Sequence, residues 1–250
     1  KKYGRVGGDP EYRRKKWREW WEREGRYKKH PIINITKPIK IPQFSKELAE
    51  FVGIVLGDGG ITKYQVVITL HSRDDKEYGK FVINLIKKLF HVPVGINYDK
   101  KCQAVDLTVS RRELVRFCVG KLGLKEGNKV KQQVNIPDWI KENKQYTIAC
   151  VRGLMDTDGS VFIHHYEVNG KFYEYTKSSF TNHSRPLLES VFNTFKDNGL
   201  NPRLSQKRDV RLDSIKDMRK YFKIFNPHNP KYLNKYQKKS KLNLQIGGVA

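Results

Sequence analysis

The sequence predicts an α+β fold made of two pseudo-symmetric repeats, each with the element order αββαββα. Two observations lead to this prediction. An apolar helix that ends in Asp-Gly occurs twice, and Asp158 follows Asp58 by 100 residues. After each copy, apolar residues recur with the periods of strands and helices in the same order, which indicates an internal duplication.

The first repeat is expected to open with a helix that Ser45 caps and that ends at Gly57-Asp58-Gly59-Gly60. The elements that follow are a strand at 64–72, a helix at 76–90, strands at 92–98 and 103–109, and a helix at 112–121.

The second repeat is expected to open with a helix from Thr147 that ends at Asp158-Gly159. The elements that follow are strands at 161–166 and 171–180, a helix at 186–198, strands at 202–206 and 210–213, and a helix at 214–225. The first two of these strands are joined through Asn169-Gly170, a strong hairpin signal.

The net charge of +24 requires a polyanionic partner or a solvating role, and nucleic acid is the common partner of such a chain. Three cysteines without a CxxC pair fit neither a zinc site nor a disulfide framework. No apolar run approaches the length of a membrane span. We therefore expect an intracellular protein, in the cytoplasm or nucleoid of a prokaryote or in an organelle matrix, with no membrane partner.

The chain is expected to divide into four segments. They are a basic N-terminal helix with an extended linker (1–43), the first repeat with the inter-repeat linker (44–143), the second repeat (144–242) and a C-terminal tail (243–250). In the first segment, Trp17, Trp20 and Trp21 recur at roughly helical spacing from residue 13 to 29, and Gly25 is expected to end the helix. Two interpretations stay open: a clamp on the nucleic-acid backbone, or an ordinary docking helix with a solvated face.

Gly53 and Gly153 occupy equivalent positions inside the two apolar helices. A glycine there costs about 1 kcal/mol relative to alanine, so it needs a reason, and close approach of two helix backbones supplies one. Helices packed side by side in this way would bring Asp58 and Asp158 together at one end. Paired carboxylates of this kind suit hard divalent cations such as Mg²⁺.

The segments FVGIVLGDG and VRGLMDTDG resemble the two copies of the LAGLIDADG motif in monomeric, two-repeat homing endonucleases. The resemblance extends over residues 45–242 and includes the order of elements. It implies a metal-dependent endonuclease that cuts both strands of a long, asymmetric duplex site and leaves short 3′ overhangs. It also implies two saddle-shaped antiparallel sheets in the major groove, packed together through the motif helices.

The same resemblance implies roles for particular residues. Asp58 and Asp158 would bind the catalytic Mg²⁺ ions, helped by the backbone carbonyls of Gly57 and Thr157, and Mn²⁺ or Ca²⁺ can replace Mg²⁺ for binding. Members of the family also keep a basic residue near each active site. By position, these are Lys131 in the first half and either Lys235 or Lys238 in the second half. The alternative for each is a lysine that contacts phosphate or only solvent.

In a sheet that lies in the major groove, alternate side chains face the base edges. The candidates in the first repeat are Gln65, Thr69, His71, Arg73, Asn97, Asp106 and Thr108. The candidates in the second repeat are Lys171, Tyr173, Thr176, Ser178, Arg203, Ser205, Lys207, Arg208 and Arg211. A solvated strand face is the alternative for each of them. The two sets differ at nearly every position, which predicts an asymmetric target.

Two other functions fit the same fold. One is an intron RNA maturase, with intron RNA as its partner, and the other is a catalytically silent DNA-binding regulator. Retention of both acids argues for cleavage. The sequence lacks an initial Cys or Ser and a terminal His-Asn pair, so we expect a free-standing or intron-encoded monomer rather than an intein.

Overall fold

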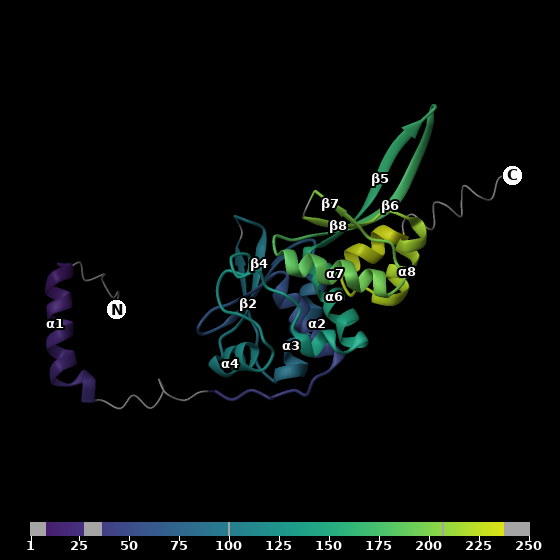
Figure 1. The fold of residues 1–250 in the computed structure, drawn as a ribbon. Coiled ribbons are helices and arrows are strands. Elements are labelled where there is room, and N and C mark those ends of the chain that lie inside the picture. Colours follow the sequence, from purple (N-terminus) through teal and green to yellow (C-terminus); the bar gives the residue numbers. More distant parts are fainter. Residues whose placement is uncertain (1–8, 28–36, 100, 207, 238–250) are drawn as a thin grey trace. The chain divides into compact units, whose positions relative to one another are not determined.

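The computed structural model describes residues 9–27, 37–99, 101–206 and 208–237, which form two compact units, Lys1–Thr36 and Lys37–Ala250. The first unit contains helix α1 (Pro10–Arg23) and the short 3₁₀ helix η1 (Gly25–Tyr27) (Figure 1). Helix α1 begins at Pro10 because the Asp9 carboxylate accepts from the N–H of Glu11 at 3.0 Å, and proline needs no N–H partner at this position. It therefore begins three residues before the predicted start.

The second unit contains both repeats. The elements of the first repeat are α2 (Lys46–Leu56), β1 (Gly59–Ile61), β2 (Val66–His71), α3 (Lys76–Phe90), β3 (Gly95–Asp99), β4 (Ala104–Val109) and α4 (Arg112–Gly120). A short helix, α5 (Asp138–Lys141), leads into the second repeat. The elements of the second repeat are α6 (Lys144–Asp158), β5 (Gly159–Val168), β6 (Lys171–Thr181), α7 (Arg185–Asp197), β7 (Arg203–Ser205), β8 (Asp209–Leu212) and α8 (Ile215–Phe225).

Each repeat forms one antiparallel four-stranded sheet. The strand order is β1-β2-β4-β3 in the first repeat and β5-β6-β8-β7 in the second, so the two sheets have the same topology (Figure 1). The predicted α+β fold with two αββαββα repeats is therefore confirmed. The clearest difference between the two sheets is the hairpin of β5 and β6, which projects beyond its sheet. Its strands pair from Gly159 with Phe180 to Val168 with Lys171.

Helices α2 and α6 pack backbone against backbone between the two sheets. A Cβ atom added at Gly53 would overlap the carbonyl oxygen of Cys150, and one added at Gly153 would lie 2.5 Å from the carbonyl oxygen of Glu50. Helix α6 begins at Lys144 rather than at the predicted Thr147, because the Asn143 side chain accepts from two backbone N–H groups of the first turn. The added turn is exposed or half-buried, and the buried residues of α6 begin at Ile148.

The segment that follows each repeat crosses to the other repeat. After the first repeat, Gln133 donates to the carbonyl of His183 at 3.2 Å, and Ser184 at the start of α7 donates to the carbonyl of Val134. After the second repeat, Asn229 donates to the carboxylate of Asp75 at the start of α3, at 2.8 Å. We call these two segments, 129–135 and 228–232, the crossing segments.

The inner face of each sheet and the helices that cover it form one core of buried residues. In β2, for example, the buried side chains are Val66, Ile68 and Leu70, and the alternate residues point away from the core. Among the described residues, no helix combines the length and apolar character needed to cross a bilayer.

Candidate metal and DNA-binding site

The two motif acids lie at neighbouring ends of α2 and α6, where β1 and β5 begin. Burial and, to a smaller extent, the nearby Asp158 carboxylate raise the pKa of Asp58 to about 7. Burial also raises the pKa of Asp158, whereas Lys129 and a hydrogen bond from Asn182 lower it. Two partly buried carboxylates that repel each other form a natural site for a divalent cation.

Lys129 reaches this pair from the first crossing segment. Its Nζ donates to the carbonyl oxygens at the end of α2, at 3.2 Å to Val55 and 2.9 Å to Leu56, and also to that of Gly57. Burial lowers the pKa of Lys129, and the two motif carboxylates oppose that shift. The ammonium group is therefore fixed by backbone oxygens next to both acids.

The sequence pointed to Lys131 for this position, and the structure corrects that prediction to Lys129. Lys131 is exposed, and its backbone N–H donates to the Asn128 side chain in a turn. Both lysines occur in NKVKQ, and only the first side chain extends toward the helix ends. In the second half, Lys235 is also exposed, and Lys238 lies outside the described residues.

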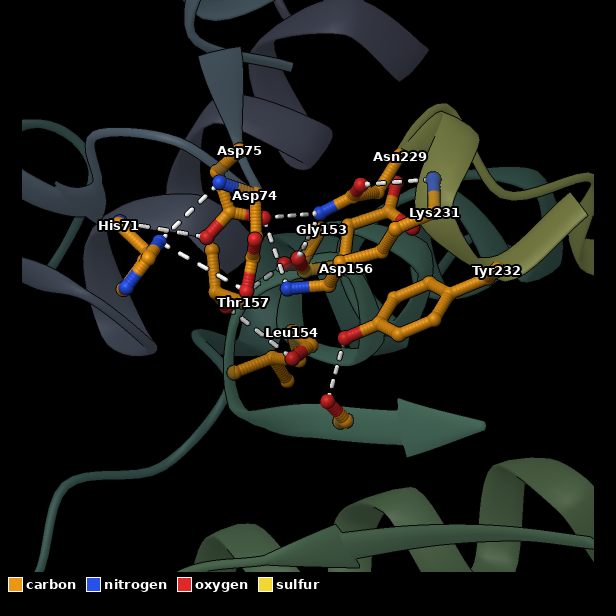
Figure 2. Close-up of polar contacts among 11 residues, drawn as sticks. His71, Asp74, Asp75, Gly153, Leu154, Asp156, Thr157, Asn229, Lys231 and Tyr232 are labelled. Atoms are coloured by element: carbon orange, nitrogen blue, oxygen red, sulfur yellow. Dashed lines mark hydrogen bonds and ion pairs between the residues drawn. The ribbon is translucent and has the colours of Figure 1, made fainter. Parts of the chain in front are cut away.

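In the second half, Asn229 takes the place that Lys129 has in the first. It lies 100 residues after Lys129, and its Nδ2 donates to the Asp156 carbonyl, 3.1 Å away, as Lys129 does to the equivalent Leu56 carbonyl. Lys231 lies two residues further and pairs with Asp75, with 2.7 Å between Nζ and Oδ1. Figure 2 shows Asn229 and Lys231 together at this carboxylate.

Gly57 and Thr157, the two residues predicted to offer carbonyl oxygens, face each other across the helix interface. A Cβ atom on Gly57 would overlap the hydroxyl of Thr157. That hydroxyl donates to the carbonyls of Gly153 and Leu154, at 2.9 and 3.0 Å, and so closes the last turn of α6 (Figure 2). The motif ends are thus held close to each other without a gap.

Asn182, which sequence reasoning missed, belongs to the same site. It follows β6, and its Nδ2 donates to the Asp158 carboxylate at 2.7 Å. The first-repeat acid Asp58 has no equivalent amide donor among the described residues. Nothing in the local sequence indicates this contact, because it joins residues 24 positions apart across the sheet.

A second group of possible ligands lies further along the helix interface: Glu50, Asp156 and His228. Arg152 binds both carboxylate oxygens of Glu50, at 3.1 and 2.6 Å, and the backbone N–H of His228 donates to Asp156 at 2.9 Å. Burial raises the pKa of Asp156 to about 8. A guanidinium already balances this cluster, so we interpret it as a tie between the helices rather than as a metal site.

The outward face of the first sheet contains most of the candidates predicted there. Thr69 and His71 in β2, and Asp106 and Thr108 in β4, alternate with buried residues, and Thr69 donates to Asp106 at 2.6 Å. Asn97 lies in β3, where every residue is exposed. The two candidates beside the strands are exposed or half-buried: Gln65 and Arg73. This face is therefore accessible to a partner.

In the second sheet, two predicted base contacts are wrong. Thr176 and Ser178 are buried, with exposed fractions of 6% and 1%, on the face that packs against the core. Strand β6 alternates without interruption from Lys171, so its outward residues after Tyr173 are Tyr175, Lys177 and Ser179. The prediction changed faces between 173 and 176, in a strand too long for local polarity to mark its buried side.

The remaining candidates of the second sheet are exposed or half-buried. Arg203 pairs with Asp213 and Arg211 pairs with Asp209, each at 3.0 Å. Ser205 is half-buried and Arg208 is exposed, whereas Lys207 lies outside the described residues.

No protein-family model matches the chain. Among curated proteins, a stretch of 121 residues is 32% identical to a replication factor C small subunit of Methanocaldococcus jannaschii and covers 48% of this chain. A stretch of 128 residues is 28% identical to a tRNA-splicing ligase RtcB of Methanopyrus kandleri and covers 46%. The matches span only 6% and 13% of those two proteins, respectively.

Among solved structures, the I-LtrWI LAGLIDADG homing endonuclease bound to its target DNA matches with a TM-score of 0.51 at 15% identity. The match covers 82% of this chain and 92% of the endonuclease. This chain has the LAGLIDADG fold. In this LAGLIDADG fold, α2 and α6 are the two motif helices, and the motif acids lie at their ends.

Two further structures are similar over most of their length. I-DmoI in complex with DNA and Mn is 21% identical, with a TM-score of 0.48 and coverage of 72% of this chain and 96% of I-DmoI. The N-terminal LAGLIDADG domain of DUF199/WhiA is 18% identical, with a TM-score of 0.49 and coverage of 74% and 84%. At these identities the likeness concerns the LAGLIDADG fold alone.

Proposed function

We propose that this chain is a metal-dependent endodeoxyribonuclease that cuts both strands of a long, asymmetric duplex site and leaves short 3′ overhangs. The observation that carries the proposal is the placement of Asp58 and Asp158 at adjoining helix ends, with the Lys129 ammonium fixed beside them. Paired acids that can hold divalent cations, with a buried cation beside them, can stabilise the charge that develops during phosphodiester hydrolysis.

The residues at this site fit a hard divalent cation. Asp58 and Asp158 offer carboxylate oxygens, and Thr157 and Gly57 lie beside them with carbonyl oxygens, the ligand type that Mg²⁺ and Mn²⁺ prefer. The Gly57 carbonyl also accepts from Lys129. Such an ion, when bound, would lower the pKa of water and offset charge on the phosphate. Burial and the neighbouring Asp158 carboxylate raise the pKa of Asp58 although Lys129 lowers it, which supports a site where a divalent cation would stabilise the charged carboxylates.

The chain's own side chains would supply the remaining chemistry. Lys129 holds a positive charge where negative charge develops on the phosphate during cleavage. Asn182 donates to Asp158 and fixes the direction of its free oxygen. Both groups are held by contacts with the protein, so they need not reorganise when DNA binds.

The proposal assigns DNA recognition to the outward faces of the two sheets. Those faces differ in chemistry: the first carries Thr69 hydrogen-bonded to Asp106, and the second carries Lys171 and Lys177 along a longer hairpin. An asymmetric target follows, and one chain holds both halves, which is why we propose a monomer. The charge of +24 makes binding strongly dependent on salt.

The test is selection of cleaved duplexes from a randomised library in Mg²⁺, with Asp58→Asn and Asp158→Asn as matched variants. We expect one long asymmetric site that the parent cuts and that both variants only bind. Tight binding without cutting in Mg²⁺ or Mn²⁺ would overturn the nuclease and favour the DNA-binding regulator. Selective binding of intron RNA with no duplex cleavage would favour the maturase.

A further inference from the structure

Helix α1 presents an aromatic surface that the proposed nuclease does not use. None of its residues is buried, and Trp17 and Trp21 expose 58% and 40% of their surface. Their rings stack, with centroids 5.5 Å apart and planes 9° from parallel. Large exposed aromatic surfaces of this kind mark sites of interaction.

The turn after the helix packs against Trp21 and the neighbouring Trp20. Gly25 is buried against them: a Cβ atom there would lie 2.6 Å from the Trp21 ring and 2.8 Å from the Trp20 ring. The turn therefore covers one side of the tryptophan cluster. Trp17 is the more exposed ring of the stacked pair, and its outer face is free to accept another flat ring.

Positive charge borders the same surface. At about 100° per residue, Arg13 and Arg14 fall beside Trp17 on the helix and Arg18 follows on one flank. These three arginines form no ion pair within the described part of the chain. Measured from Trp17 at about 100° per residue, the helix acids lie further round than Arg18, with Glu11 at about 120°, Glu22 at about 140° and Glu19 at about 160°.

We propose that this face of α1, formed by Trp17, Trp21, Arg13, Arg14 and Arg18, binds unpaired nucleotides of a single-stranded nucleic acid. A base would extend the stack on Trp17, and the arginines would contact the phosphates on either side of it. Paired bases in a duplex have their faces covered, and their edges need polar partners that tryptophan lacks, apart from one N–H. The site is thus distinct from the sheet faces proposed for duplex DNA.

The test uses the full chain and labelled oligothymidylate and oligouridylate of about 15 nucleotides, with affinity measured by fluorescence anisotropy. The variant is Trp17→Ala with Trp21→Ala. The matched control is Tyr12→Ala, which removes an aromatic ring exposed to 60% from the other side of the same helix. Circular dichroism checks that the helix persists, and cleavage or binding of the selected duplex is measured on the same preparations.

We expect the double variant to lose about tenfold or more in affinity for single strands, and the control to lose little. Duplex binding should change in neither variant, so the result does not depend on whether the chain is a nuclease. Preference for oligouridylate would identify RNA as the partner, and equal affinity would identify single strands of either kind. Unchanged single-strand affinity, a loss confined to duplex DNA, or binding of the intact face only to anionic lipid vesicles would each overturn the proposal.

Discussion

The two repeats have the same strand order but differ at one equivalent position next to the motif acids. In the first repeat, a lysine side chain reaches the end of the motif helix, and Lys129 brings its charge close to both acids. In the second repeat, Asn229 makes the equivalent hydrogen bond without a charge. The nearest cation there, Lys231, is paired with the buried carboxylate of Asp75.

This difference shows what duplication preserves and what it leaves free to change. The backbone geometry, the glycine contact and the hydrogen bond to the helix-end carbonyl occur in both halves. The formal charge at that hydrogen bond occurs in only one. The two cleavage sites of the proposed enzyme therefore share a scaffold but not an electrostatic environment.

The largest effect is expected from the motif acids. Asp58→Asn and Asp158→Asn should each reduce cleavage of both strands by at least about a hundredfold, because the two carboxylates lie close enough to perturb each other. Nicked and linear products from a supercoiled plasmid with the selected site are measured over time. Accumulation of a stable nick in one strand only would show instead that the two halves work independently.

The next largest effect on cleavage is expected from one of two lysines in the same turn. Lys129→Met should slow cleavage by about a hundredfold at saturating DNA, since it removes the charge beside the acids. Lys131→Met, at an exposed position two residues away, should leave the single-turnover rate nearly unchanged. Equal losses in both variants would contradict the assignment of Lys129 and indicate two phosphate contacts.

The helix interface can be tested for the contact that both halves share. Gly53→Ala should lower the free energy of unfolding by about 1–3 kcal/mol or more, because its Cβ atom would overlap the backbone of Cys150. Gly79→Ala, inside α3 and 3.7 Å from Leu70, should be neutral or stabilising by up to about 1 kcal/mol. Urea denaturation followed by circular dichroism gives both values, and similar losses would argue against a specific close approach.

Asn229→Ala tests the second half of the comparison. Asn229 is fully buried and donates to both Asp75 and the Asp156 carbonyl, so its loss should destabilise the protein by about 1–3 kcal/mol. Asn234→Ala, at an exposed position in the helical segment 230–237, is the control and should have little effect. A stable Asn229→Ala protein with altered cleavage would assign Asn229 to the chemistry rather than to the fold.

The smallest effect concerns pH. Asp58 must lose its proton to bind a cation, and its pKa is raised to about 7. The affinity for the metal should therefore be full above that pH and fall as the pH decreases through it. The decrease should be at most about tenfold per pH unit for one proton. Calorimetric titration with Mn²⁺ between pH 6 and pH 8, values that bracket this pKa, measures the change in metal affinity. A flat profile would place the metal on other ligands.

The sequence was sufficient to predict the order of elements in the repeats except for the three-residue strand β1 (Gly59–Ile61), because each longer helix and strand has its own period of apolar residues and the duplication repeats it. It did not distinguish Lys129 from Lys131, since the direction of a side chain in a turn depends on the local backbone. It also placed Thr176 on the wrong face. In β6, polar residues lie on both faces, so local composition does not mark the buried one.

Contacts between distant parts of the chain were not predictable at all. The contacts of Asn182 with Asp158 and of Asn229 with Asp75 are each formed by folding, and no motif marks Asn182, Asn229 or Asp75. The same limit applies to the pair of Lys231 and Asp75, which are 156 residues apart. These contacts set the charge around the motif acids, which is why the electrostatics of the site emerged only from the structure.

The crossing segments have a consequence for how the protein assembles. Each repeat relies on the other's trailing segment to complete the start of a helix, at Asp75 in one case and Ser184 in the other. A chain cut between the repeats would leave a buried carboxylate and a buried hydroxyl without these partners. We therefore expect unfolding in one transition, and separately produced halves that recover a native structure only when mixed.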